Sequence, residues 1–131
     1  MEYRYISGAE LCDLIDGGKP GLVIVDVRDD DFQGGNIRGA RNICSDDIFG
    51  DPAAVAEQLG QFSVVVVHCM LSQVRGPKSA RVLSEAFGEM KSRPRPEVLV
   101  LEGGFSSFFS QFVRKRPDLF EGLPPHLQQT V

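Results

Sequence analysis

One short segment of the chain holds the residues best equipped for chemistry. His68 and Cys69 directly follow a run of valines at residues 64–67, and Arg75 stands six positions after the cysteine. Residues 70–75 contain no proline, so six consecutive backbone N–H groups are available to curl around an anion as a nest. A cysteine thiolate is a nucleophile, and a guanidinium presents a planar fork of donors to two oxygens of a tetrahedral anion. The segment therefore predicts a nucleophile and its oxyanion receptor in one loop.

The other residues of this loop are expected to support the reaction. The amide cradle is predicted to comprise Met70, Leu71, Ser72, Gln73, Val74 and Arg75. We expect the Ser72 hydroxyl to hydrogen-bond the sulfur, and His68 to brace the loop from below rather than to act as a catalyst. A helix predicted to begin at Pro77 adds its positive N-terminal end, which favours the thiolate form of Cys69.

A purely structural interpretation of Cys69 is the alternative. A single cysteine after a valine-rich strand is commonly a small buried hydrophobic residue. The arginine six positions later, followed by Gly76 and Pro77 at the start of a helix, favours catalysis instead.

Size and composition limit the class of protein. A chain of 131 residues buries one sizeable core, so we predict a single domain over residues 1–131. A net charge of −4 argues against nucleic acid as a partner, because that would need a basic face. The longest apolar run is far below the roughly 20 residues of a membrane span, and the N-terminus lacks a signal-peptide pattern. Three widely spaced cysteines predict neither a disulfide framework nor a zinc site, which favours the cytoplasm, with the nucleus as an alternative.

Short apolar strands alternate with helical segments along the chain. Strands are expected at residues 21–27, 40–43, 62–67 and 98–101, where apolar and β-branched residues form short runs. Such alternation indicates a parallel sheet covered on both faces, with ligands bound beyond the carboxyl ends of the strands.

Helices are expected between these strands. Ser7 and Glu10 have the spacing of a capping box before a helix that stops at Gly17, residues 51–59 form a second, and a third runs on from Pro77. A stripe of helix-spaced aromatic residues follows, which we interpret as core packing rather than a cofactor site: Phe105, Phe108, Phe109 and Phe112. The segment from Pro117 onward is predicted to be a loosely packed end.

The loop HCMLSQVRGP resembles the His-Cys-x5-Arg loop shared by the cell-division-cycle dual-specificity phosphatases and the eukaryotic arsenate reductases, both built on the rhodanese fold. Residues 25–43 are similar to that family's first conserved block, and LEGGF at 101–105 resembles its last strand and turn. The block's matching positions are Asp26, Arg28, Phe32, Gly35, Ile37, Gly39, Ala40 and Asn42. The resemblance covers about residues 5–112, leaving 113–131 as a C-terminal tail. It implies an α/β, rhodanese-like three-layer sandwich with a central, mostly parallel five-stranded sheet.

The resemblance also implies a cysteine-dependent enzyme acting on a tetrahedral oxyanion. Our first expectation is an arsenate reductase with phosphatase activity, in which a Cys69–arsenate adduct is reduced by an external thiol. No cofactor or metal is expected to be bound, and glutathione with glutaredoxin would supply the electrons. The alternative is a protein tyrosine or dual-specificity phosphatase, which forms a phosphocysteine and has a phosphoprotein as its partner.

Two further functions are disfavoured. Thiosulfate sulfurtransferases of the rhodanese type have one residue fewer between cysteine and arginine than the five found here. A non-catalytic rhodanese module used only for binding would be expected to have lost Cys69 or Arg75. A module that keeps the loop to bind phosphate or sulfate without turnover remains a less favoured alternative. Gly76, directly after the arginine, fits the rhodanese-fold branch rather than the unrelated tyrosine phosphatases, which usually keep a serine or threonine there.

Two parts of the chemistry are not readable from the resemblance. The phosphatases often carry a second cysteine at the position of Val27, which is absent here, so an oxidised Cys69 would have to be rescued by another cysteine or by glutathione and glutaredoxin. Cys12 and Cys44 are candidates only if the fold brings them close.

A general acid is not identified either. The candidates lie near strand ends, and each is more commonly a solvated surface group: Asp29, Asp30, Asp31 and Glu102. Asp26 and Arg28 are expected to form an internal ion pair or to support the loop rather than to catalyse.

Overall fold

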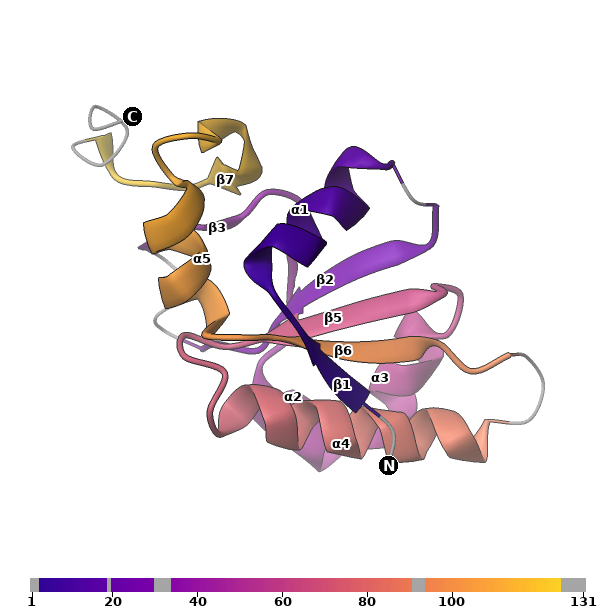
Figure 1. Ribbon diagram of the computed structural model, residues 1–131. Coiled ribbons are helices and arrows are strands. Elements are labelled where there is room, and N and C mark those ends of the chain that lie inside the picture. The colour runs from indigo at the N-terminus through magenta and orange to yellow at the C-terminus, as the bar shows by residue number, and fades with distance from the viewer. Residues whose placement is uncertain (1–2, 19, 30–33, 91–93, 126–131) are drawn as a thin grey trace.

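The computed structural model describes residues 3–18, 20–29, 34–90 and 94–125. Its centre is a sheet of five strands in the order β1-β6-β5-β2-β4, and every pairing in it is parallel (Figure 1). The strands are β1 (Tyr3–Ile6), β6 (Glu97–Leu101), β5 (Val64–His68), β2 (Leu22–Asp26) and β4 (Arg41–Asn42). The predicted α/β class with a central parallel sheet is confirmed.

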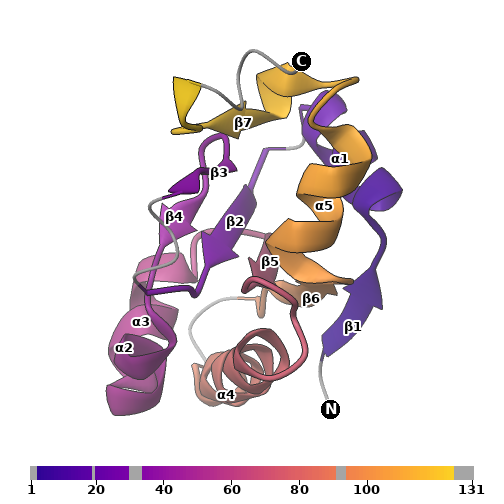
Figure 2. The same ribbon diagram turned by 90° about the vertical axis from the view of Figure 1, so that its left-hand side faces the viewer.

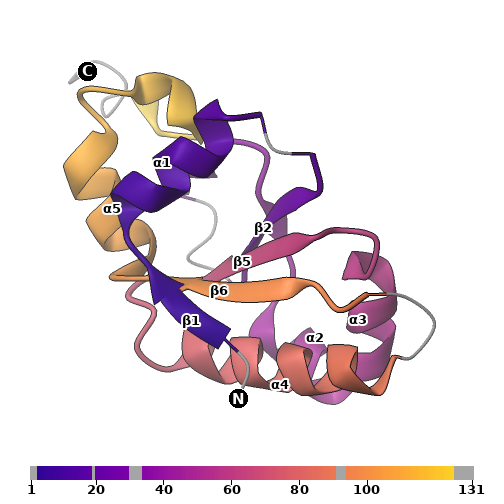
Figure 3. The same cartoon turned by 45° about the vertical axis from the view of Figure 1, so that its right-hand side comes forward.

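Helices cover both faces of the sheet, which makes the three predicted layers (Figure 2). One face carries α1 (Gly8–Asp16) and α5 (Gly104–Phe112), and the other carries α2 (Ser45–Gly50), α3 (Pro52–Leu59) and α4 (Arg75–Glu89). Figure 3 shows β1 at the edge of the sheet beside β6, between these two layers. Among the described residues, no helix combines the length and the apolar character needed to cross a membrane.

The valine run of β5 shows why that strand reads as continuously apolar. Val65 and Val67 belong to the core beneath α2, α3 and α4. Val64 and Val66 belong to the second core, beneath α1 and α5. Because successive side chains point to opposite faces, a strand buried on both faces needs an apolar residue at every position.

Two helices begin where the sequence predicts. The Ser7 hydroxyl accepts from the Glu10 amide at 3.1 Å, and the Glu10 carboxylate accepts from the Ser7 amide at 2.9 Å, which completes the capping box. Asp51 caps α3 through a hydrogen bond from the Ala54 amide, and Pro52 takes the first helical position.

The predicted start of α4 at Pro77 is wrong by two residues, because α4 begins at Arg75. Pro77 lies within the first helical turn, where backbone N–H groups have no partner inside the helix. Its missing N–H therefore costs no hydrogen bond, and the proline marks the interior of the first turn rather than its start.

The aromatic stripe on α5 packs into the core as predicted. Phe105 and Phe108 are buried, and Phe109 and Phe112 are packed against the same core. The ring of Phe120 lies 5.6–6.0 Å from three of these rings.

Phe120 shows that the end of the chain is not loosely packed, so that prediction is wrong for residues 117–123. This segment forms a 3-10 turn at Pro117–Leu119 and the strand β7 (Phe120–Glu121), which pairs antiparallel with β3 (Asn36–Ile37). Leu119, Phe120 and Leu123 are all buried. A two-residue strand shows no periodicity in the sequence, so its pairing with β3 was not visible there.

A buried polar cluster closes the carboxyl end of the sheet. Asp26, at the end of β2, accepts hydrogen bonds from Arg28 Nε at 2.9 Å and Nη2 at 2.7 Å, and neither side chain is more than 1% exposed. His68, at the end of β5, is completely buried, with its Nε2 3.8 Å from an Asp26 carboxylate oxygen. The expected internal ion pair of Asp26 and Arg28 is present. Burial lowers the pKa of His68 despite the attraction of Asp26, so the imidazole is neutral at neutral pH.

We predict that protonating His68 destabilises the fold. Because its folded pKa lies below the ordinary value of 6.5, the stability gained from the neutral ring is complete above that pH and is lost as the pH falls toward the folded pKa. The slope reaches about 1.4 kcal/mol per pH unit. Urea unfolding of a His126→Gln chain, whose only histidine is then His68, checks this between about pH 7.5 and 5.5. If the added substitution His68→Gln leaves this slope unchanged, His68 is not its source.

Candidate active site

The sulfur of Cys69 lies at the start of the loop between β5 and α4 and is held by the loop's own backbone. The Ser72 amide donates a hydrogen bond to Cys69 Sγ at 3.0 Å, and the Cys69 residue is 3% exposed. The Ser72 hydroxyl accepts from the Cys69 amide at 3.4 Å. We had expected the hydroxyl to bond the sulfur, but the backbone amide does so. A backbone N–H directed at sulfur stabilises negative charge there.

This hydrogen bond requires an unusual backbone conformation. Ser72 has φ of +55° and, among the described residues, no other non-glycine residue has a positive φ. Such a conformation costs on the order of 1 kcal/mol and persists only where its surroundings impose it. The loop is therefore held in a strained shape that turns the Ser72 amide toward the sulfur.

The first turn of α5 donates hydrogen bonds to the first two carbonyls of the loop. The Phe105 and Ser106 amides donate to the Cys69 and Met70 carbonyls, each at 2.9 Å. His68 Nδ1 lies 3.0 Å from the same Cys69 carbonyl, to which it donates, as expected for a residue that braces the loop. In a planar trans peptide the N–H points opposite to the carbonyl. The amides of Met70 and Leu71 therefore point away from α5.

This approach of α5 depends on glycine. Gly104 has φ of +62°, and a Cβ atom there would lie 2.5 Å from the Cys69 and Met70 carbonyl oxygens. The sequence predicts only a turn at the glycine pair Gly103 and Gly104, and the pair's contact with the loop is not visible in it. The pair's position after a buried strand was the available signal, because glycine there often marks close backbone approach.

The N-terminus of α4 lies against the sulfur. A Cβ atom added to Gly76 would lie 3.5 Å from Cys69 Sγ. No side chain caps this helix, whose N-cap residue is Val74. Its first amides, which have no partner within the helix, are thus placed to bind an anion beside the thiol.

Both predicted catalytic residues and all the predicted cradle residues except Ser72, which is buried with its amide bonded to the sulfur, meet at one small cavity of about 170 Å³. It is lined by Cys69, Met70, Leu71, Gln73, Val74 and Arg75. Arg75 is the first residue of α4, and its side chain is 34% exposed, with Nη1 3.6 Å from a carboxylate oxygen of Asp29. The structure therefore brings nucleophile, amides and guanidinium together at the carboxyl end of the sheet.

The general-acid candidates are only partly placed. Asp29 lies beside Arg75, as its 3.6 Å contact shows. Glu102 is exposed and does not line the cavity. Asp30 and Asp31, together with Phe32 of the resembling block, lie outside the described residues.

The candidate partner cysteines lie in different layers. All three cysteines are free thiols. Cys12 is buried in the core beneath α1 and α5, and that burial raises the pKa of its thiol, whereas Cys69 belongs to the core on the other face. Cys44 directly precedes α2, on the same face as Cys69. The sheet thus separates Cys12 from Cys69.

Known proteins resemble this chain in sequence and in fold. The model of the rhodanese-like domain matches residues 7–111. Dual specificity phosphatase ibp1 of Schizosaccharomyces pombe is 36% identical over 102 residues, which cover 66% of this chain and 74% of that protein. Arsenate reductase 2.1 of Oryza sativa is 33% identical over 107 residues, which cover 79% of this chain and 66% of that protein.

A solved structure also has a similar fold. The As-Sb reductase from Leishmania major has a TM-score of 0.80 and 30% identity, covering 96% of this chain and 90% of that one. The chain also matches the much longer M-phase inducer phosphatase 1-B of Xenopus laevis, of which it spans 22%. From the matched residues and the shared fold, this chain belongs to the rhodanese-like domain family.

Proposed function

We propose that this protein reduces arsenate, with accompanying phosphatase activity, using Cys69 as the nucleophile and Arg75 as the anion clamp. One observation carries the proposal: the sulfur, the uncapped N-terminus of α4 and the guanidinium meet at a single small cavity. The amides of Met70, Leu71 and Gln73 complete the proposed oxyanion receptor. His68, Gly76, Asp26 and Arg28 hold the loop in place and take no part in bond making.

The proposed reaction begins with attack of the Cys69 thiolate on arsenic. An oxygen leaves as hydroxide and is protonated to water, which leaves a sulfur–arsenic bond. A glutathione thiolate then attacks the Cys69 sulfur, and the electron pair of the sulfur–arsenic bond passes to arsenic. Arsenite departs, Cys69 remains as a mixed disulfide with glutathione, and glutaredoxin reduces it. Free thiols persist in a reducing compartment, so we place this reaction in the cytoplasm, with the nucleus as the alternative.

The shape of the site supports a small substrate. Within the described part of the chain, the cavity is lined by residues of the loop and the first residue of α4. The Asp29 carboxylate beside the site is paired with the Arg75 guanidinium, with 3.6 Å between Oδ1 and Nη1. Expulsion of hydroxide from arsenate needs less help from a positioned acid than expulsion of an alkoxide does.

A protein tyrosine or dual-specificity phosphatase is the second candidate function. The sequence identity to ibp1 supports it, and the same thiolate would attack phosphorus to give a phosphocysteine that water hydrolyses. In that case the partner is a phosphoprotein rather than a free oxyanion and glutaredoxin.

Paired assays on two substitutions test the mechanism. We expect Cys69→Ser to abolish both arsenite production with glutathione and glutaredoxin and hydrolysis of para-nitrophenyl phosphate. Arg75→Lys keeps the charge but loses the planar fork, so kcat should fall by about 100-fold or more. Rapid Cys69-dependent phosphate release without arsenite would identify a phosphatase. If neither reaction depends on Cys69, the proposed chemistry is wrong.

A pair of glycine substitutions tests whether α5 positions the loop. Gly104→Ala forces its Cβ onto the Cys69 and Met70 carbonyls, so we expect kcat/KM for arsenate to fall by about 100-fold as the cradle shifts. Gly18→Ala is the matched control, since Gly18 has a nearly identical φ of +61° and open space around its Cα. Its melting temperature should fall through backbone strain alone, with activity retained. Equal activity losses in the two variants would show that the contact with α5 is not what matters.

A further inference from the structure

The sheet edge at β2 is only half covered. β4 pairs with the last two residues of β2, in the register Val25↔Arg41 and Asp26↔Asn42. The first three residues of β2 pair with β5 on their other side and, within the described part of the chain, have no strand partner on this side. An unpaired stretch of strand presents backbone donors and acceptors to any further strand that approaches.

The chain leaves this stretch open because it turns just before β4. Gly39 has φ of +81°, and the Ala40 amide donates to the Ile37 carbonyl at 3.0 Å, which closes a tight turn. Arg38 anchors the turn on its far side, donating to the carbonyls of residues 118 and 120 at 2.8 and 2.9 Å. β4 therefore cannot extend backward to cover the start of β2.

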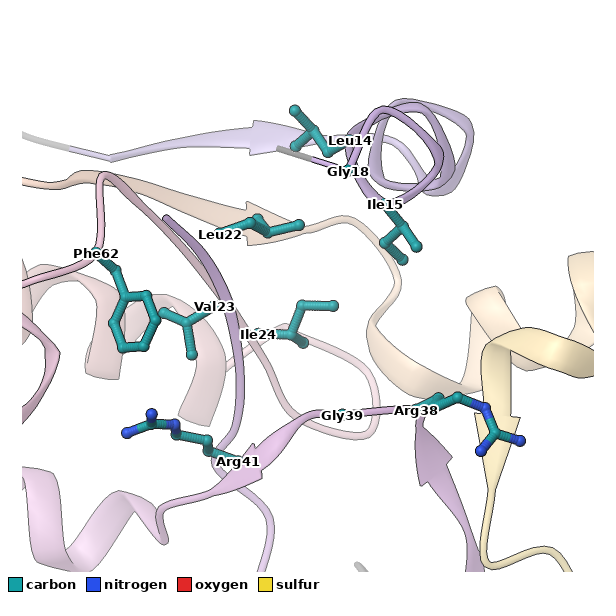
Figure 4. A pocket seen from close by; sticks show the side chains of 10 residues that line it. All are labelled: Leu14, Ile15, Gly18, Leu22, Val23, Ile24, Arg38, Gly39, Arg41 and Phe62. Atoms are coloured by element: carbon teal, nitrogen blue, oxygen red, sulfur yellow. The ribbon is translucent and has the colours of Figure 1, made fainter. Parts of the chain in front are cut away.

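A groove of about 340 Å³ follows the uncovered edge (Figure 4). Figure 4 shows Val23 and Ile24 pointing to opposite sides of β2, with Phe62 beside Val23 and Ile15 of α1 on the side of Ile24. Leu14 of α1 also lines it. An added strand would alternate its side chains between the same two sides. The groove thus offers apolar contacts to both faces of an added strand, as well as backbone partners between them.

The charge in this groove is opposite to that of the whole chain. Among the described residues that line it, the charged ones are Arg38 and Arg41, although the net charge of the chain is −4. Arg38 is already engaged and points toward β7 in Figure 4. The Arg41 guanidinium lies 4.9 Å from the centre of the Phe62 ring, and no carboxylate of the described residues forms an ion pair with it. A carboxylate from outside is therefore the complementary partner for Arg41.

We propose that this β2-edge groove binds an extended acidic peptide segment of a partner protein. The peptide adds a strand beside residues 22–24, places apolar side chains on both sides of the edge, and sets an Asp or Glu against Arg41. The groove lies at the amino end of β2, whereas Cys69 lies beyond the carboxyl ends of the strands. A peptide bound there leaves the loop at Cys69 open, so the groove can hold a partner protein without blocking that loop. This assignment does not depend on the proposed function.

Binding of a defined probe tests the proposal. The probe is a fluorescein-labelled peptide of about seven residues, long enough to span the uncovered edge, with alternating valine and threonine and a glutamate at each end. Matched peptides carry lysine in place of glutamate, or a central proline that removes a ladder donor. We expect the acidic peptide to raise the anisotropy and to shift the amide NMR signals of Leu22 and Ile24, and we expect the other two to bind at least about tenfold more weakly.

A charge reversal makes the test specific. Arg41→Glu should weaken the acidic peptide by about tenfold or more and should favour the lysine peptide. Arg81→Glu makes the same change in net charge on the exposed face of α4 and should alter neither affinity. Arg41→Gln, a milder change, repeats the loss of acidic-peptide binding if the reversal lowers the melting temperature.

Three results would overturn the proposal. Affinity for the acidic peptide that survives Arg41→Glu would exclude the ion pair, and equal affinity for the proline peptide would exclude strand addition. Concentration-dependent shifts of the Leu22 and Ile24 amides without any peptide would make a second copy of the chain the occupant.

Discussion

The arrangement of the loop between β5 and α4, which begins at Cys69, depends on the buried ion pair between Asp26 and Arg28. Both side chains are essentially inaccessible, and their charged atoms approach to 2.7 Å. Removing one partner of such a pair typically costs about 3–5 kcal/mol, because the other charge is left buried alone. Arg28 also donates to the Gly35 carbonyl and lies 4.4 Å over the Phe105 ring. The pair thus joins the end of β2 to the opening of α5, which in turn holds the loop that begins at Cys69.

Two groups lie close enough to Cys69 Sγ to act on the thiolate of the proposed reaction, and their typical contributions differ in size. A hydrogen bond to a charged group contributes about 1.5–3 kcal/mol, whereas a helix N-terminus contributes about 0.3–1 kcal/mol. The Ser72 amide, 3.0 Å from the sulfur, is therefore a stronger local influence than the end of α4. The strain of about 1 kcal/mol at Ser72 is smaller than the contribution that this hydrogen bond would make to a thiolate.

Features set by short-range patterns could be predicted from the sequence, and features set by long-range contacts could not. Three features each lie within a few residues and are visible in the sequence: the capping box of Ser7, the buried valine strand and the Cys69–Arg75 spacing. The β3–β7 pair joins residues more than 80 positions apart through two-residue strands, so no periodic pattern in the sequence predicts it. The amide of Ser72 at the sulfur and the approach of Gly104 follow from backbone geometry, which residue types alone do not specify.

The contact between Arg75 and Asp29 means that the proposed anion site carries its own counter-ion. With a carboxylate 3.6 Å from the guanidinium, an incoming ligand must compete with a monovalent anion tethered to the protein. Chloride and simple carboxylates, which carry one charge, gain little from that exchange. A dianion with several oxygens gains both the guanidinium and the loop amides. In the proposed reaction, the tethered carboxylate therefore favours exchange for a doubly charged oxyanion over exchange for a common monovalent ion.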